Sequence, residues 1–371
     1  MTTFSDLDLE PREEGPVEEA PERVTRRPRR VRRTTFDDYL ELGGSFLSSG
    51  ALVGVLYGHV FNMSGVLGFL VLWYFAFMVI FGLTLKITNP NPLVVDKLVQ
   101  ATIFVASAVV IAALLSALIF VVVKGLHALG HLNFFTHNMA GVSPTAPLSQ
   151  GGIFHAIVGT LVEISVAVAI SLPLGLMTAV FLSEVGGKWS NLVRTVVEAM
   201  TALPEILAGL FVYVVMIVYF GFPRSGFAVS VAMSVTMVPI IARTGEVSLR
   251  IVPNGLREAS NALGGSEWRT TWKVVLPSAR AGLATALILA IARGIGETAI
   301  PLICSGASSF TNFNPFANPM NSLPLFILTG FQTGQSVAIE RAFGAGTVLL
   351  VLILGLFVLT RFLARDRKVK R

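Results

Sequence analysis

Two charged residues interrupt an otherwise apolar stretch at residues 279–303. Arg293 and Glu297 are four residues apart, so in one continuous helix they share a face. An ionised group deep in a membrane costs at least ~2.5–3.5 kcal/mol, so it normally faces a bundle interior or an aqueous path. Small neighbours would let a helix or a ligand approach closely: Gly294, Gly296 and Ala299. Two interpretations follow, a buried ion pair that locks two helices together or a pathway for an anion.

A second pattern lies in a polar segment at about residues 246–278. Glu258-Ala-Ser260 is followed by three residues and Gly264, and after nine more residues by Val274-Val-Leu276-Pro277. Apolar residues recur near a helical period, which predicts an amphipathic helix: Leu256, Ala259, Ala262 and Leu263. Gly264 permits the positive φ of a sharp turn. A second short helix would then present Trp268, Trp272 and Val275 as an apolar stripe and end at Pro277. Such a knob of two helices can seat in a groove on a soluble partner.

The composition places these patterns in a membrane protein. Of the 371 residues, 53% are hydrophobic and 13% are charged, whereas soluble domains carry about 25% charged residues. A single cysteine, Cys304, excludes an internal disulfide. The net charge of +6 does not indicate nucleic-acid binding, because the basic residues lie where a membrane protein has its loops.

Eight apolar spans are predicted, most of them near the ~20 residues that cross a bilayer. They cover residues 46–61, 65–85, 98–123, 155–183, 195–220, 226–245, 279–303 and 343–363. The first is interrupted by Ser48, Ser49 and His59. With the N-terminus inside, most of the 28 Lys and Arg residues fall on the inner side, as the positive-inside rule requires. Without the first span the basic run at residues 23–33 would lie outside.

The predicted organisation has three parts. Residues 1–43 form a disordered cytoplasmic tail, acidic and then basic, because few large apolar residues offset the entropy of ordering. Residues 44–97 form a transmembrane hairpin with an inner loop, and residues 98–371 form a six-span domain. Two long outer loops at 124–154 and 304–342 are expected to pack on the outer mouth or on a partner.

Several kinds of chemistry are not expected of this chain. Gly186-Gly-Lys188-Trp189 lacks the earlier glycine and the Ser or Thr of a phosphate-binding loop, so ATP chemistry must come from another chain. No nucleophile and base are suitably placed, so the chain is not expected to be an enzyme. The histidines of the first outer loop have spacings that do not suit a metal site: His127, His131, His137 and His155.

The segment at 246–278 resembles the EAA loop of ABC-importer permeases, with Ser260 in place of an alanine and Val274 in place of an isoleucine. The resemblance implies the fold of a type I importer permease, six transmembrane helices, here with an extra N-terminal hairpin. It also implies that the knob contacts an ATP-hydrolysing subunit and transmits its motion. The implied coupling residues are Glu258, Ala259, Ser260, Gly264, Trp268, Leu276 and Pro277.

Three further segments make residues 98–365 similar to the PstA-type permeases of phosphate importers. They are Arg293-Gly-Ile-Gly-Glu-Thr-Ala299, Asn321-Ser-Leu-Pro-Leu325 and Gly151-Gly-Ile-Phe-His-Ala-Ile-Val-Gly-Thr160. The resemblance implies a multi-pass protein of the bacterial inner membrane with both termini cytoplasmic. Its implied partners are a PstC-type permease, two PstB-type ATPase subunits and a PstS-type phosphate-binding protein. ATP and magnesium would bind in the ATPase subunits, and no cofactor would bind in this chain.

The same resemblance makes Arg293 and Glu297 the substrate pathway pair, to which we add Thr298. A guanidinium suits a tetrahedral oxyanion, and Glu297 could accept the proton that phosphate retains near neutral pH. Sulfate has no such proton and would be repelled. The chain departs from the expected pattern at Leu203-Pro-Glu205, where a small polar residue should follow the proline. Glu205 either pairs with an Arg of the loop or faces a partner.

Three alternatives stay open at this point. The cargo could be another oxyanion, such as sulfate or molybdate. The chain could be a secondary transporter or channel that needs no ATPase, although such proteins often contain internal repeats and none is evident. It could also be an assembly or regulatory membrane protein whose Arg–Glu pair is only structural.

Overall fold

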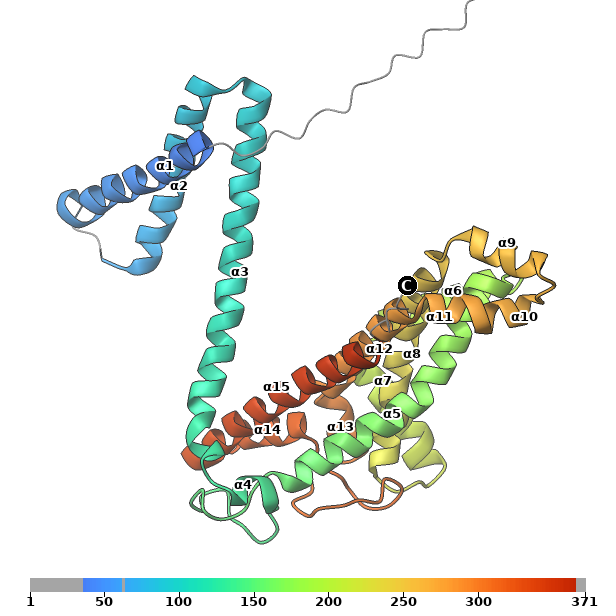
Figure 1. The fold of residues 1–371 in the computed structure, drawn as a ribbon. Helices are drawn as coiled ribbons and strands as arrows, with labels where there is room; N and C mark the ends of the chain where they lie inside the picture. Colours follow the sequence, from blue (N-terminus) through green and yellow to red (C-terminus); the bar gives the residue numbers. More distant parts are fainter. Residues whose placement is uncertain (1–35, 62–63, 365–371) are drawn as a thin grey trace, which may run out of the picture. The chain divides into compact units, whose positions relative to one another are not determined.

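The computed structural model describes residues 36–61 and 64–364, and no β-strand occurs in these ranges (Figure 1). The predicted all-α class is therefore confirmed for the described residues. They divide into two compact units, one up to Val110 and one from Ile111 onward. The predicted disordered tail lies outside the described residues as far as residue 35, and the first helix begins at Phe36.

The first unit contains a helical hairpin. Helix α1 (Phe36–Val55) ends in a π-helical turn, η1 (Leu56–Val60), and α2 (Val66–Thr88) follows. The indole of Trp73 on α2 donates hydrogen bonds to the Phe46 carbonyl oxygen at 3.2 Å and to Ser49 Oγ at 3.1 Å. Polar groups of both helices are thus satisfied inside the hairpin, as a lipid environment demands. Helix α3 (Asn91–Leu129) begins in this unit.

Long apolar helices form the frame of the second unit. They are α5 (Phe154–Val180) with its π-helical turn η2 (Phe181–Val185), α8 (Gly226–Arg250), α12 (Arg280–Ile295) and α15 (Ser336–Ala364). Helix α5 packs on α8, α8 on α12, and α12 on α15. The shorter elements are α4 (Asn133–Thr136), α6 (Ser190–Ala202), α7 (Glu205–Val212), η3 (Tyr213–Tyr219), α9 (Asn254–Ala262), α10 (Glu267–Thr270), η4 (Thr271–Val275), α11 (Leu276–Ser278), α13 (Ala299–Cys304) and α14 (Leu323–Gln332).

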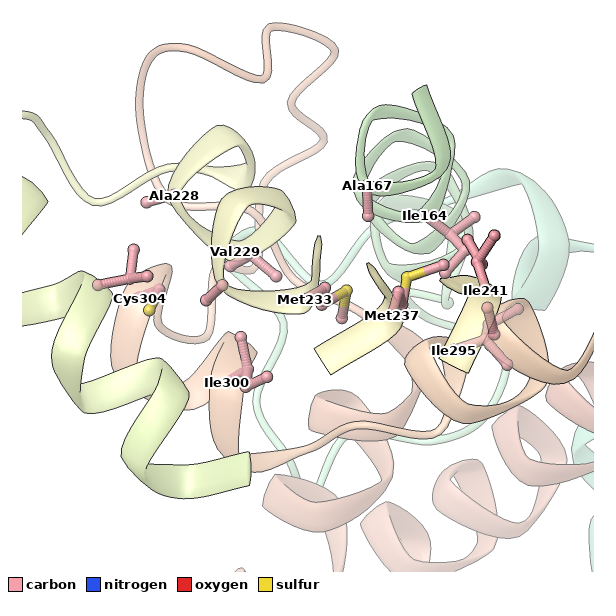
Figure 2. Close-up of a cluster of buried hydrophobic side chains, with 13 residues drawn as sticks. Ile164, Ala167, Ala228, Val229, Met233, Met237, Ile241, Ile295, Ile300 and Cys304 are labelled. Carbon is pink, nitrogen blue, oxygen red and sulfur yellow. The ribbon is translucent and has the colours of Figure 1, made fainter. Parts of the chain in front are cut away.

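Small residues let α5 and α8 approach closely. A Cβ added at Gly175 would lie 2.7 Å from the Cβ of Ile241, and one added at Gly245 would lie 2.9 Å from the Cβ of Ala179. Close contact of this kind replaces hydrophobic driving force as the source of helix association in lipid. The core beside this contact contains Met233 of α8 together with residues from both sides of a helix break, among them Ile295 and Ile300 (Figure 2).

In the part of the chain that the structure describes, six helices are long and apolar enough to cross a membrane, or up to eight if each of two bent pairs counts as one span. This agrees with the eight spans predicted. Two of those spans are not single straight helices, however. Residues 195–220 divide into α6 and α7, with a bend of 102° between the two halves. The helix over Glu267–Ser278 meets α12 at 72°, and α12 itself ends at Ile295, before α13 begins at Ala299.

A buried arginine fixes the long segment before α5. Arg341, in the second turn of α15, is only 1% exposed. Its guanidinium donates hydrogen bonds of 2.9–3.4 Å to four backbone carbonyls, those of Pro144, Ala146, Pro147 and Gln150. This segment and α4 lie at the end of the second unit opposite α9 and α10 (Figure 1). The segment is therefore fastened to the last helix by one side chain.

Candidate functional site

The predicted knob is present as α9, a turn, and the continuous helix α10–η4–α11. Gly264 has a φ of +81°, which confirms the predicted left-handed turn. Ser266 caps α10, because its Oγ accepts a hydrogen bond from the Arg269 amide at 3.4 Å. The chain can therefore reverse between two short helices without leaving their ends unsatisfied.

Polar side chains hold the two arms of the knob together. Ser260 Oγ and Thr270 Oγ1 are 2.8 Å apart, and Thr270 Oγ1 donates to Asn261 Oδ1 at 3.2 Å. A Cβ at Gly265 would lie 2.8 Å from the Ser260 carbonyl oxygen, so this position has no room for a side chain. The serine that departs from the expected alanine thus supplies a hydroxyl to the interior of the knob.

Large apolar side chains cover the outside of the knob. Leu263 is 90% exposed and Trp268 is 67% exposed. The rings of Trp268 and Trp272 lie 5.4 Å apart, so they form one aromatic surface. Exposed aromatics grouped in this way are typical of a surface that binds another protein. Glu258 and Ala259 are exposed on α9.

The base of the knob differs from the prediction at Val275. That residue was expected in the exposed stripe with the tryptophans, but it is fully buried, because it points toward Ala179 of α5 and Leu249 of α8. Leu276 is buried in the same cluster. Pro277 lies in the first turn of α11, and the helix ends one residue later, at Ser278.

An arginine that the sequence analysis did not single out anchors α9. Arg257 forms a bidentate pair with Glu184 of η2, with Nε–Oε2 and Nη2–Oε1 distances of 3.1 and 2.9 Å. It also donates to the carbonyl oxygens of Val252 and Leu249 and to Asn254 Oδ1. The knob is thereby tied to the ends of both α5 and α8. An acid at the end of an apolar span, as at Glu184, was the available sequence signal.

Arg293 of the predicted pathway, and Glu205, which was not assigned to it, lie where two helices are interrupted. Glu205 is the first residue of α7, directly after the bend that separates α7 from α6. Arg293 lies in the last turn of α12, just before that helix ends. The two side chains form an ion pair, with the Arg293 side chain 56% exposed and that of Glu205 27% exposed. The alternative that Glu205 pairs with an Arg of the loop is therefore wrong, because its partner, Arg293, lies in the seventh predicted span.

Arg293 and Glu297 do not share a helix face. The helix stops at Ile295, and Glu297 follows in a short break whose amide donates to the Gly294 carbonyl oxygen at 3.2 Å. The expected i, i+4 relation fails because the glycines at 294 and 296 disfavour a continuous helix. Glu297 is buried, and Thr298 precedes the first turn of α13. The break brings Glu297 and Thr298 into the same short segment beside Arg293.

A further carboxyl group was not singled out from the sequence. Glu163 of α5 is 1% exposed, and neither of its oxygens has a hydrogen-bond partner among the described residues. Its backbone carbonyl accepts a hydrogen bond from Ser230 Oγ at 2.9 Å, which places it against α8. Within residues 36–61 and 64–364, no group of three or more His, Cys, Asp or Glu is arranged to hold a metal ion.

Comparison with known proteins gives the site a context. The family described as binding-protein-dependent transport system inner membrane component matches residues 171–369. Phosphate transport system permease protein PstA 1 of Mycobacterium tuberculosis (strain CDC 1551 / Oshkosh) is 38% identical over 275 residues, which are 73% of this chain and 90% of the relative. PstA of Pasteurella multocida is 32% identical over 244 residues, 64% of this chain and 83% of the relative.

A solved structure of a bacterial ABC transporter involved in alginate import is 15% identical. It covers 73% of this chain and 99% of its own, with a TM-score of 0.46.

Proposed function

Because the chain belongs to the family of binding-protein-dependent transport system inner membrane components, and to the PstA-type phosphate permeases within it, we propose that it forms half of the translocation pathway of an ATP-driven phosphate importer. It is a multi-pass inner membrane protein and a transport subunit. The observation that carries the proposal is the exposed guanidinium of Arg293 at an interruption between apolar helices. Broken helices at membrane depth are where transporters build their binding sites.

Phosphate is the oxyanion that best suits this pathway. Arg293 offers a planar fork of N–H donors to a tetrahedral oxyanion. Glu297, buried four residues away, would accept the proton that phosphate still carries near neutral pH. Sulfate has no such proton, and the carboxylate would repel it. Thr298 adds a hydroxyl in the same break.

The knob would couple this pathway to ATP hydrolysis. Glu258, Ala259, Leu263 and Trp268 lie on its outside, where a PstB-type ATPase would bind. Closure of two such subunits would push on the turn at Gly264, and Arg257 would pass the movement to α5 and α8. A PstC-type permease would supply the other half of the pathway, and a PstS-type binding protein would deliver phosphate from outside.

Phosphate uptake in cells that lack their own phosphate importers tests the proposal. The chain would be co-expressed with its PstC-, PstB- and PstS-type partners, and radiolabelled phosphate would be offered with excess sulfate or molybdate as competitor. We expect uptake that requires an active ATPase and resists both competitors. Assembly of the complex without ATP-dependent phosphate uptake would overturn the assignment.

Site-directed labelling tests the orientation. With both termini cytoplasmic, the knob faces the cytoplasm, so a cysteine at the exposed position Leu263 should resist an impermeant thiol reagent in sealed cells and react in open membranes. The native Cys304 is buried and should contribute little. Labelling of Leu263→Cys in sealed cells would contradict the proposed coupling.

A further inference from the structure

We propose that Glu205 is a built-in counter-ion that occupies Arg293 when no anion is bound and that incoming phosphate must displace. This inference rests on the proposed function and adds a regulatory step at the same site. The carboxylate of Glu205 and the guanidinium of Arg293 form their ion pair within one chain. Arg293 therefore has an anionic ligand before any substrate arrives.

The position of Glu205 suits a ligand that exchanges. It begins α7 immediately after Leu203-Pro204, where the backbone is extended and the bend of 102° occurs. Arg293 lies at the end of α12, two residues before the second interruption of the helices. Each charge is thus at the end of a helix rather than in its middle, so either side chain can leave the pair while its own helix stays intact.

The guanidinium of Arg293 is less enclosed than that of Arg341. The Arg293 side chain is 56% exposed, so Glu205 covers only part of its guanidinium, although the Glu205 oxygen in the pair is itself buried. Arg341, by contrast, is buried against four carbonyls. A carboxylate and a phosphate use the same donors of a guanidinium, and phosphate brings more charge and more oxygens. Phosphate can therefore replace Glu205, whereas nothing comparable can replace the ligands of Arg341.

The displacement would also alter the contact between the two interrupted helices. Helix α7 packs on α13 where Gly209 meets Ile300; an added Cβ at Gly209 would lie 3.4 Å from the Ile300 Cα. The ion pair links α7 to α12. Helix α12 lies before the break at residues 296–298, and α13 lies after it. Loss of the ion pair on phosphate binding would leave α7 joined to α13 and released from α12. Phosphate would thus change which helices move together.

Chemical protection of Arg293 measures this exchange directly. The complete permease–ATPase complex would be treated with the arginine reagent phenylglyoxal at increasing inorganic phosphate, and the adduct at Arg293 would be quantified by peptide mass spectrometry. If Glu205 competes with phosphate for Arg293, Glu205→Gln should raise modification without phosphate. It should also lower the half-protecting phosphate concentration by about two- to fivefold. Glu198→Gln, at an exposed carboxylate on α6, is the matched control and should change neither value.

Each other outcome has a definite meaning. Unchanged modification and protection in an assembled Glu205→Gln complex would overturn the counter-ion proposal. Failure of Glu205→Gln to assemble, while Glu198→Gln assembles, would also overturn it, because the pair would then be a structural lock. If phosphate gives no protection in the wild-type complex and the complex transports no phosphate, the proposed function itself fails.

Discussion

Arg257 in the knob and Arg293 in the interrupted helices bind carboxylates in different ways. Arg257 has a bidentate carboxylate and three further acceptors, and it joins three segments of the chain. Arg293 has one carboxylate and remains more than half exposed. A guanidinium whose donors are all used can only hold structure, whereas one with spare donors can receive a ligand. The contrast separates an arginine whose donors are all used within the chain from one that has donors left for the proposed cargo.

The largest expected effect is that of Arg293→Ala on transport. Loss of the guanidinium removes the main attraction for a tetrahedral anion, so phosphate uptake should fall by about 10²–10³-fold. Copurification with the ATPase should not change, because the pair with Glu205 is partly exposed. Loss of assembly instead would show that Arg293 has a structural role.

Truncation of the knob's aromatic surface should have the next largest effect. Trp268→Ala removes an exposed indole that we expect to fill a pocket on the ATPase, and such anchors typically contribute about 2 kcal/mol or more. Binding of the purified ATPase to the permease should weaken by about 30-fold. Trp189→Ala, at another exposed tryptophan outside the knob, is the control and should bind normally.

Arg257→Ala should reduce the coupling of ATP hydrolysis to transport without preventing assembly of the complex. The change leaves Glu184 without its arginine and frees α9 from α5. The loss should lower the stability of this contact by about 1–3 kcal/mol. The ATPase should still bind and hydrolyse ATP, while phosphate taken up per ATP should fall by about tenfold. Arg250→Ala is a useful comparison, because its partner Glu246 keeps Arg194 at 2.6 Å. Equal losses in both variants would mean that Arg257 has no special role.

The smallest effect is expected at Glu163. Its carboxyl group has no hydrogen-bond partner among the described residues, so the change to an amide in Glu163→Gln removes no hydrogen bond. The free energy of unfolding, measured by thermal unfolding of the solubilised complex, should change by less than about 1 kcal/mol, and phosphate uptake should not change. A strong loss of uptake would place Glu163 with Arg293 among the residues of the pathway.

Some features of the fold could be predicted from the sequence, and others could not. The apolar spans and the turn at Gly264 follow from local composition, and both were predictable. The interruption after Leu203 was not, because proline alone does not decide it: Pro173 and Pro239 lie inside unbroken α5 and α8. A proline ends a helix only where the surrounding packing does not stabilise its continuation.

Charged partners were the least predictable part of the site. Arg293 was expected to share a helix face with Glu297, but its ion pair forms with Glu205 of another span. Which carboxylate lies beside a guanidinium depends on how helices distant in sequence meet, and the spacing along one helix contains no such information. Val275 was misplaced for a simpler reason, since residues 271–275 form the π-helical turn η4, whose period differs from the α-helical one that predicted the stripe.

The carbonyl cage around Arg341 makes the segment at residues 144–150 a surface reporter for the last helix. A nanobody that gripped this segment would hold α15 through a single buried side chain. It would restrain any rearrangement of that helix while bound only to this segment. A fluorophore placed there would, for the same reason, follow the movements of α15 in real time.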